Sequence, residues 1–295
     1  MHLLAYWKLD NYLRDLDEGA GFNFNSKQSR LHSAIGIGDT LWLFTATPNP
    51  RRYYIVAKLV VRAKTINSPT FKYGAYRVWG DLKKSHYFLL DPSQARDEAF
   101  DLMRGLSLES GTFEDCTRTT LAQACQTMRG LTPEANRMLN TFAKHLRDEP
   151  RAHAIADEYE LERSLLVGGE DLQNVITTEH GGVSDERRRE LLGLTPRNRQ
   201  LVHELYESYA GRCQLCAFDS PIVYGVPSAE CHHIVYLSRG GLDQLTNLVL
   251  LCPNHHTIVH KTDATFDYGR LSFHFSNGRV EPLAINTHLQ RRAMV

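Results

Sequence analysis

The sequence lacks several features that would place it in other protein classes. It has no run of about eighteen uninterrupted apolar residues, so it offers no transmembrane helix. Its opening stretch, MHLLAYWKLDNYLRDLDEG, has no basic segment and soon turns acidic, so we expect no secretory signal. Four of its six cysteines (Cys213, Cys216, Cys231 and Cys252) fall close to histidines. This pattern favours a reducing, cytoplasmic compartment and metal binding over disulfides.

Net charge is absent too, because 34 basic residues balance 34 acidic ones. The charges are unevenly distributed along the chain: residues 1–92 carry 13 Lys/Arg against 7 Asp/Glu, residues 93–204 carry 14 against 20, and residues 205–295 carry 7 against 7. Uneven composition by chance is one explanation. The other is that a basic head attracts a polyanion, while the acidic middle can lie across a basic groove.

The sequence of residues 1–92, which we call the head, predicts β-structure. Five stretches are rich in β-branched and aromatic residues and are separated by turn signals such as GIGD and TPNPRR: LLAYWKL, TLWLFTAT, YYIVAKLVVRAKT, YRVWGDL and SHYFLL. Short strands at this density predict a small barrel or a strongly bent sheet. The segment NSKQSRLHSAIGIGD predicts one short helix.

From residue 93 onwards the pattern becomes helical. Apolar residues recur at three- and four-residue spacings over 93–106, 117–131, 132–146 and 152–166. Thr132 and Pro133 predict the N-cap and first turn of the third of these helices. A polar, glycine-rich linker follows, and then a helix over 196–211. We therefore predict an α+β protein with three parts: a head over 1–92, an acidic helical connector over 93–204, and a C-terminal domain over 205–295. Alternatively, helices extend the head to about residue 165.

Two pairs of ligand residues, one cysteine–cysteine and one cysteine–histidine, predict a structural zinc site. Cys213 and Cys216 have a spacing that lets two thiolates bind one tetrahedral ion, and Cys252 and His255 repeat that spacing about forty residues later. Two alternatives stay open: buried thiols without metal, or Cys231 as a ligand in place of His255.

Five further polar residues remain near this site: His232, His233, Asn247, His256 and His260. CHHIV has the pattern of a strand, in which His232 and His233 face opposite sides. HHTIVH has the pattern of a helix, in which His256 and His260 share a face. One strand histidine and the two helical ones can hold a divalent cation, which leaves the other strand histidine as a base. The side chain of Asn247 can then fix the tautomer of that base.

The stretch CQLC…ECHHIVYLSRGGLDQLTNLVLLCPNHHTIVH resembles the HNH nuclease motif, or ββα-metal finger, in its zinc-stapled form. The resemblance implies that His233 is the general base and that Asn247 orients it. It implies that His232 and His256 ligate a catalytic Mg²⁺, Mn²⁺ or Ni²⁺, with His260 as a third ligand or phosphate contact. His255 stands where the family usually has a cysteine.

The head holds 15 of the 28 aromatic residues, more than a core of this size needs. Several of them lie in polar stretches among cations, an arrangement that suits stacking of an unpaired base beside bound phosphates. Ordinary core packing is the alternative for each ring. The resulting candidates for a base pocket or DNA contact are Phe22, Phe24, Asn25, Tyr76, Arg77, Trp79, Asp81, Lys83 and Lys84.

The order of AYWKL, IGIGDTLWLFTA, YYIVAKLVV and RVWGDL resembles the PUA superfamily, particularly its EVE-type domains. Such domains flip a modified base, often 5-methylcytosine or 5-hydroxymethylcytosine, into an aromatic cage. The two resemblances together imply a modification-dependent, type IV restriction-like endonuclease that acts on double-stranded DNA. In the cage, Trp79 is the expected wall, Phe22 or Phe24 lies opposite, and Asp81 or Asn25 reads the base edge.

Two other functions remain open. The head can read unmodified DNA sequence or structure, as in a mobile-element or repair nuclease. The whole chain can instead be a non-catalytic nucleic-acid-binding module. Because one HNH finger cuts one strand, a double-strand break needs two visits or a homodimer. No membrane partner is expected.

Overall fold

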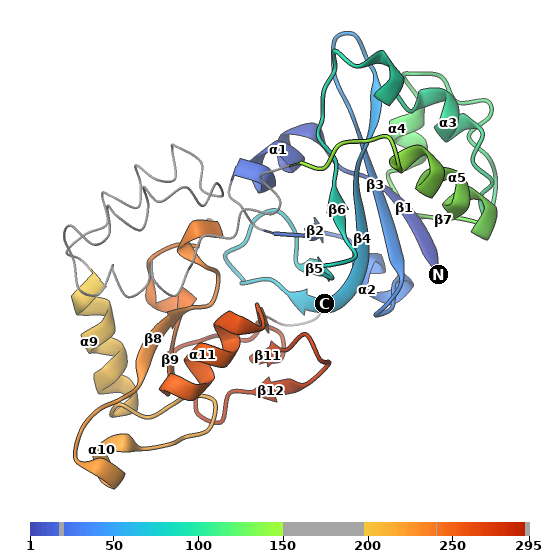
Figure 1. Cartoon of the computed structure of the whole chain (residues 1–295). Coiled ribbons are helices and arrows are strands. Elements are labelled where there is room, and N and C mark those ends of the chain that lie inside the picture. Colours follow the sequence, from blue (N-terminus) through green and yellow to red (C-terminus); the bar gives the residue numbers. More distant parts are fainter. Residues whose placement is uncertain (18–20, 150–197, 240, 293–295) are drawn as a thin grey trace. The chain divides into compact units, whose positions relative to one another are not determined.

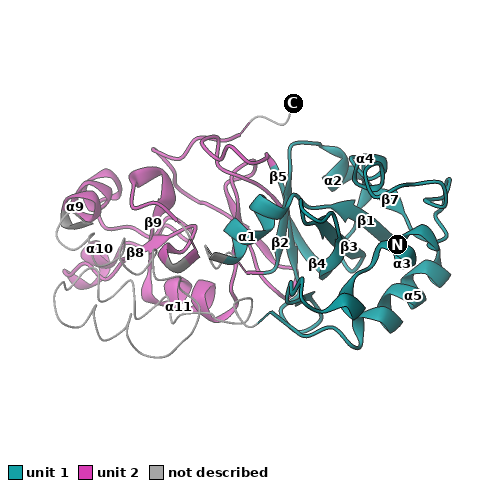
Figure 2. Ribbon diagram, turned by 90° about the horizontal axis from the view of Figure 1, so that it is seen from above, with its two compact units in different colours: residues 1–16, 22–64, 76–153 teal, residues 17–21, 65–75, 154–295 magenta. Residues whose placement is uncertain are grey.

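The structure is a computed structural model that describes residues 1–17, 21–149, 198–239 and 241–292. The chain forms two compact units (Figure 2): unit 1 holds residues 1–16, 22–64 and 76–153, and unit 2 holds residues 17–21, 65–75 and 154–295. The predicted helix over 152–166 and the linker that follows it lie outside the described residues. Among the described helices, none is long and apolar enough to cross a membrane.

A mixed seven-stranded sheet forms the centre of unit 1 (Figure 1), in the order β2-β5-β4-β3-β1-β7 with β6 paired to β4. Its strands are β1 (His2–Tyr6), β2 (Asn23–Ser26), β3 (Thr40–Ala46), β4 (Tyr53–Ile66), β5 (Tyr76–Gly80), β6 (His86–Tyr87) and β7 (Arg129–Gly130). All five predicted strands are present, and β2 is an addition. The sheet stays open in the described part of the chain, so the predicted closed barrel is not found.

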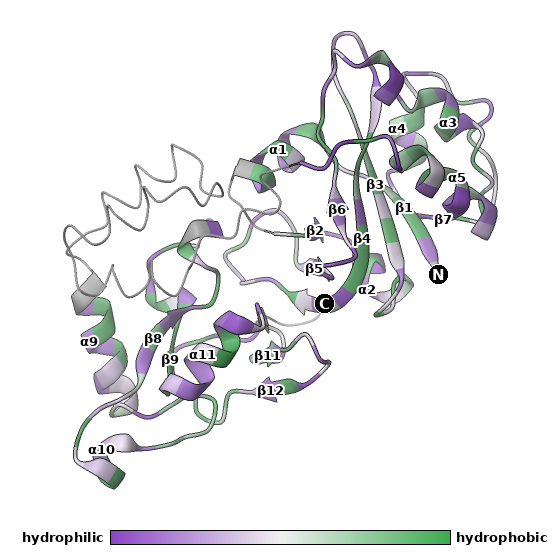
Figure 3. Cartoon of the chain, in the orientation of Figure 1, coloured by the Kyte–Doolittle hydropathy of each residue, from purple (hydrophilic) through white to green (hydrophobic). Residues whose placement is uncertain are grey.

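The open sheet is explained by its two apolar faces. Leu3, Leu43 and Val56 lie in a buried cluster with Trp7 and Tyr87. The residues that alternate with them form a second cluster, in which Leu4, Trp42, Phe44 and Ile55 pack against helical residues such as Phe100 and Leu139. Much of β4 is accordingly apolar (Figure 3). A closed barrel has only one such interior, whereas this sheet packs core on both sides.

Short helices accompany the sheet. They are α1 (Leu9–Asp17), α2 (Arg30–Ala34), the 3₁₀ turn η1 (Ala95–Asp97), α3 (Phe100–Arg104), α4 (Leu121–Ala124) and α5 (Pro133–Ala143). In α5 the Thr132 hydroxyl accepts a hydrogen bond from the backbone nitrogen of Ala135 at 3.2 Å, and Pro133 opens the first turn, as predicted. The helix predicted over 117–131 is much shorter, since α4 covers only Leu121–Ala124 and the short strand β7 follows at Arg129–Gly130.

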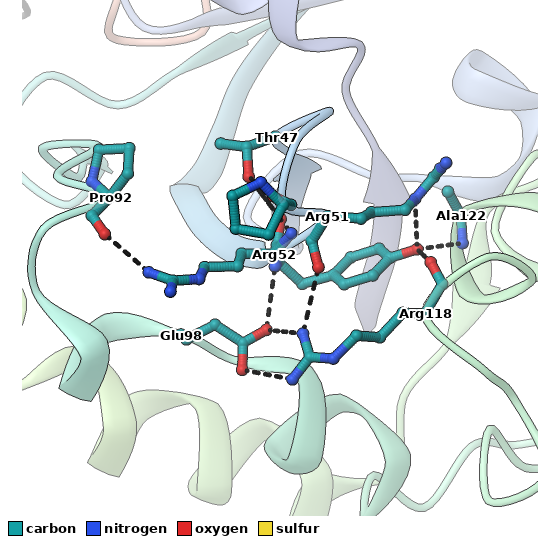
Figure 4. Close-up of polar contacts among 9 residues, drawn as sticks. Thr47, Arg51, Arg52, Pro92, Glu98, Arg118 and Ala122 are labelled. Carbon is teal, nitrogen blue, oxygen red and sulfur yellow. Dashed lines mark hydrogen bonds and ion pairs between the residues drawn. The ribbon is translucent and has the colours of Figure 1, made fainter.

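Polar contacts tie the segment after residue 93 to the sheet (Figure 4). The carboxylate of Glu98 accepts hydrogen bonds from the backbone nitrogen of Tyr53 at 3.1 Å and from the Arg118 guanidinium at 2.8 Å. The Tyr53 hydroxyl donates to the backbone oxygen of Arg118 at 2.6 Å. Residues 93–149 therefore pack as part of unit 1. The boundaries proposed from charge remain predictions.

Unit 2 contains a hairpin followed by a helix. Its elements are α9 (Asn198–Tyr209), α10 (Ser220–Tyr224), β8 (Glu230–His233), η3 (Leu237–Arg239), η4 (Leu245–Asn247), β9 (Leu248–Leu251), α11 (Pro253–Lys261), β10 (Thr265–Asp267), β11 (Ser272–His274) and β12 (Val280–Pro282). β8 and β9 are antiparallel, with His232 opposite Val249. Val249, Leu251, Val259 and Phe273 share one buried cluster, which fixes α11 against the hairpin.

Candidate active site and metal centres

Three imidazoles converge where β8 meets α11. His232 Nδ1 lies 3.2 Å from His260 Nε2, and His260 Nε2 lies 3.1 Å from His256 Nε2. Neutral imidazoles cannot satisfy such a group among themselves, because each carries one ring proton and has one lone pair. A shared cation accepts all three lone pairs, so the residues fit the predicted divalent metal site.

Neighbouring groups hold these rings in place. The Glu230 carboxylate contacts His256 Nδ1, which directs Nε2 of that ring towards the other two histidines. The Tyr236 ring stacks on His260 at 5.2 Å between ring centroids. Glu230 was not among the predicted residues. The sequence contained a signal for it, because Glu230 is two residues before His232 on the same strand and therefore on the same face.

His233 faces the other side of β8 and is 6% exposed. Its Nε2 lies 3.2 Å from Asp243 Oδ1, in an ion pair whose two side chains are buried. Asn247 makes different contacts from those predicted. Its Oδ1 accepts from the backbone nitrogen of Val235 at 2.8 Å, and its Nδ2 donates to the backbone oxygens of Val235 and Leu242, each at 2.9 Å.

Asn247 therefore shapes the loop between β8 and β9, and Asp243 contacts His233. Gly241 is the close-approach point of this loop. A Cβ atom there would lie 1.8 Å from the Val235 carbonyl oxygen and 2.9 Å from Asn247 Nδ2. Only glycine fits, because both neighbours belong to the hydrogen bonds that form the loop.

The second cluster brings together Cys213, Cys216, Cys252 and His255. His255 Nδ1 lies 3.3 Å from Cys252 Sγ and 3.6 Å from Cys213 Sγ, and its Nε2 lies 3.6 Å from a Glu281 carboxylate oxygen. Burial raises the pKa of the Cys213 thiol to about 12. A bound cation displaces such a proton, so the donor set fits tetrahedral zinc.

Cys231, the alternative ligand, lies elsewhere. Its side chain is buried in an apolar cluster with Leu205, Tyr209 and Leu250, where a small thiol packs as a hydrophobic residue. The structure therefore groups the four ligands favoured by their spacing.

The head candidates occupy three kinds of position. Phe22 and Phe24 are buried in the core, where Phe22 packs edge-on against Tyr87 and Phe24 against Trp7. Asp81 accepts from the backbone nitrogens of Lys83 and Lys84 in a turn, and both lysines are exposed.

The remaining candidates lie together on β2 and β5. Arg77 Nε donates to Asn25 Oδ1 at 2.6 Å, and the Arg77 guanidinium lies 4.9 Å from the centre of the half-buried Trp79 ring. Tyr76, also half-buried, packs edge-on against His32. Trp79 and Arg77 thus place a half-buried ring next to a buried cation.

Comparison with known proteins finds a known domain in the C-terminal part of the chain. Residues 213–262 match the HNH endonuclease family, so the chain contains an HNH endonuclease domain. Over 52 residues the chain is 42% identical to the type IV methyl-directed restriction enzyme EcoKMcrA of Escherichia coli (strain K12), a match that covers 17% of this chain and 19% of that protein. Because the chain spans about a fifth of this relative, the similarity concerns the nuclease domain.

A solved structure, that of the type IV phosphorothioation-dependent restriction endonuclease ScoMcrA, aligns with 87% of this chain and 46% of its own. The identity is 13% and the TM-score is 0.21. That value is too low to establish a common fold.

Proposed function

We propose that the protein is a metal-dependent DNA endonuclease that cuts DNA carrying modified cytosine, in the manner of type IV restriction enzymes. One observation carries the nuclease part. The ring nitrogens of His232, His256 and His260 converge, and the next residue of β8, His233, pairs with Asp243, all inside the segment that matches the HNH family. This arrangement suits phosphodiester hydrolysis, which needs a charge-stabilising centre and a nearby proton acceptor.

The residues divide the chemistry between them. His232, His256 and His260 hold a divalent cation, which supplies charge neutralisation for the scissile phosphate and the leaving 3′-oxygen. His233 takes the proton of the attacking water, and Asp243 holds the ring through Nε2, which leaves Nδ1 as the proton acceptor. Asn247 keeps the loop closed. The cysteine cluster with His255 binds zinc and fixes the start of α11.

The reading of modified cytosine is assigned to the head. Support comes from its excess of basic residues, from Trp79 lying beneath Arg77, and from the methyl-directed relative that shares the nuclease domain. Base flipping costs a few kcal/mol, and stacking on Trp79 offsets part of that cost. Double-stranded DNA is the proposed partner, and two copies or two visits are needed to break both strands.

Matched plasmids test this function directly. Plasmids carrying cytosine, 5-methylcytosine or 5-hydroxymethylcytosine are incubated with the full chain and Mg²⁺, Mn²⁺ or Ni²⁺, with EDTA and His233→Ala as controls. We expect cutting of a modified plasmid that both controls abolish. Equal cutting of all three plasmids would indicate a nuclease that reads unmodified DNA. No cutting with any of the metals would leave a binding module as the better interpretation.

A further inference from the structure

One buried carboxylate in unit 1 has an oxygen for which the described residues supply no donor. Asp15, on α1, is 4% exposed. Its Oδ1 accepts from the Arg14 guanidinium, with Nε at 3.1 Å, whereas its Oδ2 has no hydrogen-bond partner among the described residues. Buried carboxylate oxygens are almost always hydrogen-bonded, because leaving one without a donor is costly. Oδ2 is therefore a buried acceptor that a bound molecule can use.

Asp15 lies close to an edge of the sheet. β2 is an edge strand, and Asn25 pairs with Arg77 across β2 and β5. Burial raises the pKa of Asp15, whereas the charge and hydrogen bond of Arg14, the charge of Arg77 and a hydrogen bond from the Asn25 side chain act in the opposite direction. Trp79 is two residues beyond Arg77 on β5 and so shares its face. A buried acceptor, a cation and a half-exposed ring thus occur together at this edge.

We propose that Asp15 is the residue that reads the exocyclic amino group of a flipped cytosine, with Oδ2 as the acceptor. This inference rests on the proposed reading of modified cytosine. Aspartate is the natural partner of cytosine N4, whereas thymine presents an O4 acceptor at the same place. The carboxylate accordingly selects cytosines over thymine, independently of any group on C5.

Asp81, the acid expected from the sequence, has a different role. Its Oδ1 is held by two backbone nitrogens of its own turn, and it is half exposed. Asp15 and Asp81 therefore make a matched pair for an experiment, since one has an unused buried oxygen and the other caps a turn.

The experiment measures binding of the full chain to a short duplex with one 5-methylcytosine, by fluorescence anisotropy in EDTA so that no cutting occurs. In Asp15→Asn the amide oxygen faces Arg14 and the amide NH₂ takes the place of Oδ2. We expect this variant to lose about tenfold or more in affinity for the modified duplex. Asp15→Asn should bind a duplex with thymine in the same position more tightly than it binds the 5-methylcytosine duplex. Asp81→Asn should bind as the wild type does.

A second measurement uses only the wild-type protein and so does not depend on how the variant folds. The same duplex carries 5-methyl-2-pyrimidinone, which lacks the amino group. We expect a loss similar to that in Asp15→Asn. If wild type prefers 5-methylcytosine to cytosine but the amino group can be removed without loss, Asp15 is not the reader. If wild type shows no preference for 5-methylcytosine, the proposed function itself fails, and this inference fails with it.

Discussion

The most informative residues are the five histidines of residues 232–260, because their surroundings separate them into different roles. His232, His256 and His260 present nitrogens to one another, His255 presents Nδ1 to two sulfurs, and His233 contacts a carboxylate. Strand alternation and helical spacing predicted that one strand histidine joins the two helical ones, and the resemblance to the HNH motif implied that this histidine is His232. The groups that orient each ring were harder to predict, because they come from the folded loop.

The base assignment predicts a clean loss of function. His233→Ala removes the proposed proton acceptor and leaves the three proposed metal-binding rings in place. We expect plasmid nicking to fall by about a hundredfold or more, which is within the usual contribution of a general base. DNA binding, measured by mobility shift in EDTA, should be unchanged. Cleavage that persists at the wild-type rate would contradict the assignment.

Asp243 gives a second residue-scale prediction. Asp243→Asn keeps the side-chain shape but changes what faces His233 Nε2, so we expect the cleavage rate to fall about ten- to a hundredfold. The Michaelis constant for DNA and the melting temperature should stay close to the wild-type values.

A double-mutant cycle separates positioning from a structural role. If Asp243 acts through His233, Asp243→Asn should cost almost nothing in the residual activity of His233→Ala. An equal loss in both backgrounds would mean that Asp243 supports the loop and not the base.

At the scale of elements, the loop between β8 and β9 depends on two features: the hydrogen bonds of the Asn247 amide and the close approach of the backbone at Gly241. Gly241→Ala forces the added methyl group into the Val235 carbonyl, so the loop must shift. We expect a cleavage loss of about tenfold or more, because displacements of about 1 Å in a catalytic site have large effects. Gly105→Ala is the control, since its Cβ would meet only ordinary contacts beyond 3.6 Å at a negative φ. Wild-type cleavage by Gly241→Ala would show that the loop tolerates the shift.

The proposed zinc ligands give a prediction for α11. Cys252→Ser should lose the zinc proposed to bind there and lower the melting temperature, because structural zinc contributes directly to folding. His255→Cys should keep the metal, since a fourth thiolate also suits tetrahedral zinc. Zinc content by atomic absorption and thermal unfolding by circular dichroism check both. Cys231→Ser distinguishes the alternative ligand set: we expect zinc to be retained, and its loss would make Cys231 a ligand.

The elements that could be predicted from sequence were those with a clear pattern. Strands β3 and β4 have β-branched and aromatic residues, and α5 has a capping threonine followed by proline. β2 was missed because its sequence, NFNS, is half asparagine, a poor strand former. Pairing with β5 makes it a strand, and local propensity contains no information about that partner. The closed barrel was wrong for a similar reason, since the sequence does not show that helices from beyond residue 93 cover one face.

For the whole molecule, the proposal joins a reader in unit 1 to a nuclease in unit 2, and Trp79 tests whether the reader works as described. Trp79→Ala removes a ring whose stacking is worth about 1–3 kcal/mol for each unpaired base, so we expect preference for the modified plasmid to fall about ten- to a hundredfold. Basal nicking of unmodified plasmid should persist, because His233 and the metal-binding histidines are untouched. Trp79→Phe should keep most of the preference, since it keeps a ring. Unchanged cutting of modified and unmodified plasmids by Trp79→Ala would exclude Trp79 from base recognition. Asp15 and Asn25 would then remain as the candidates that contact the base.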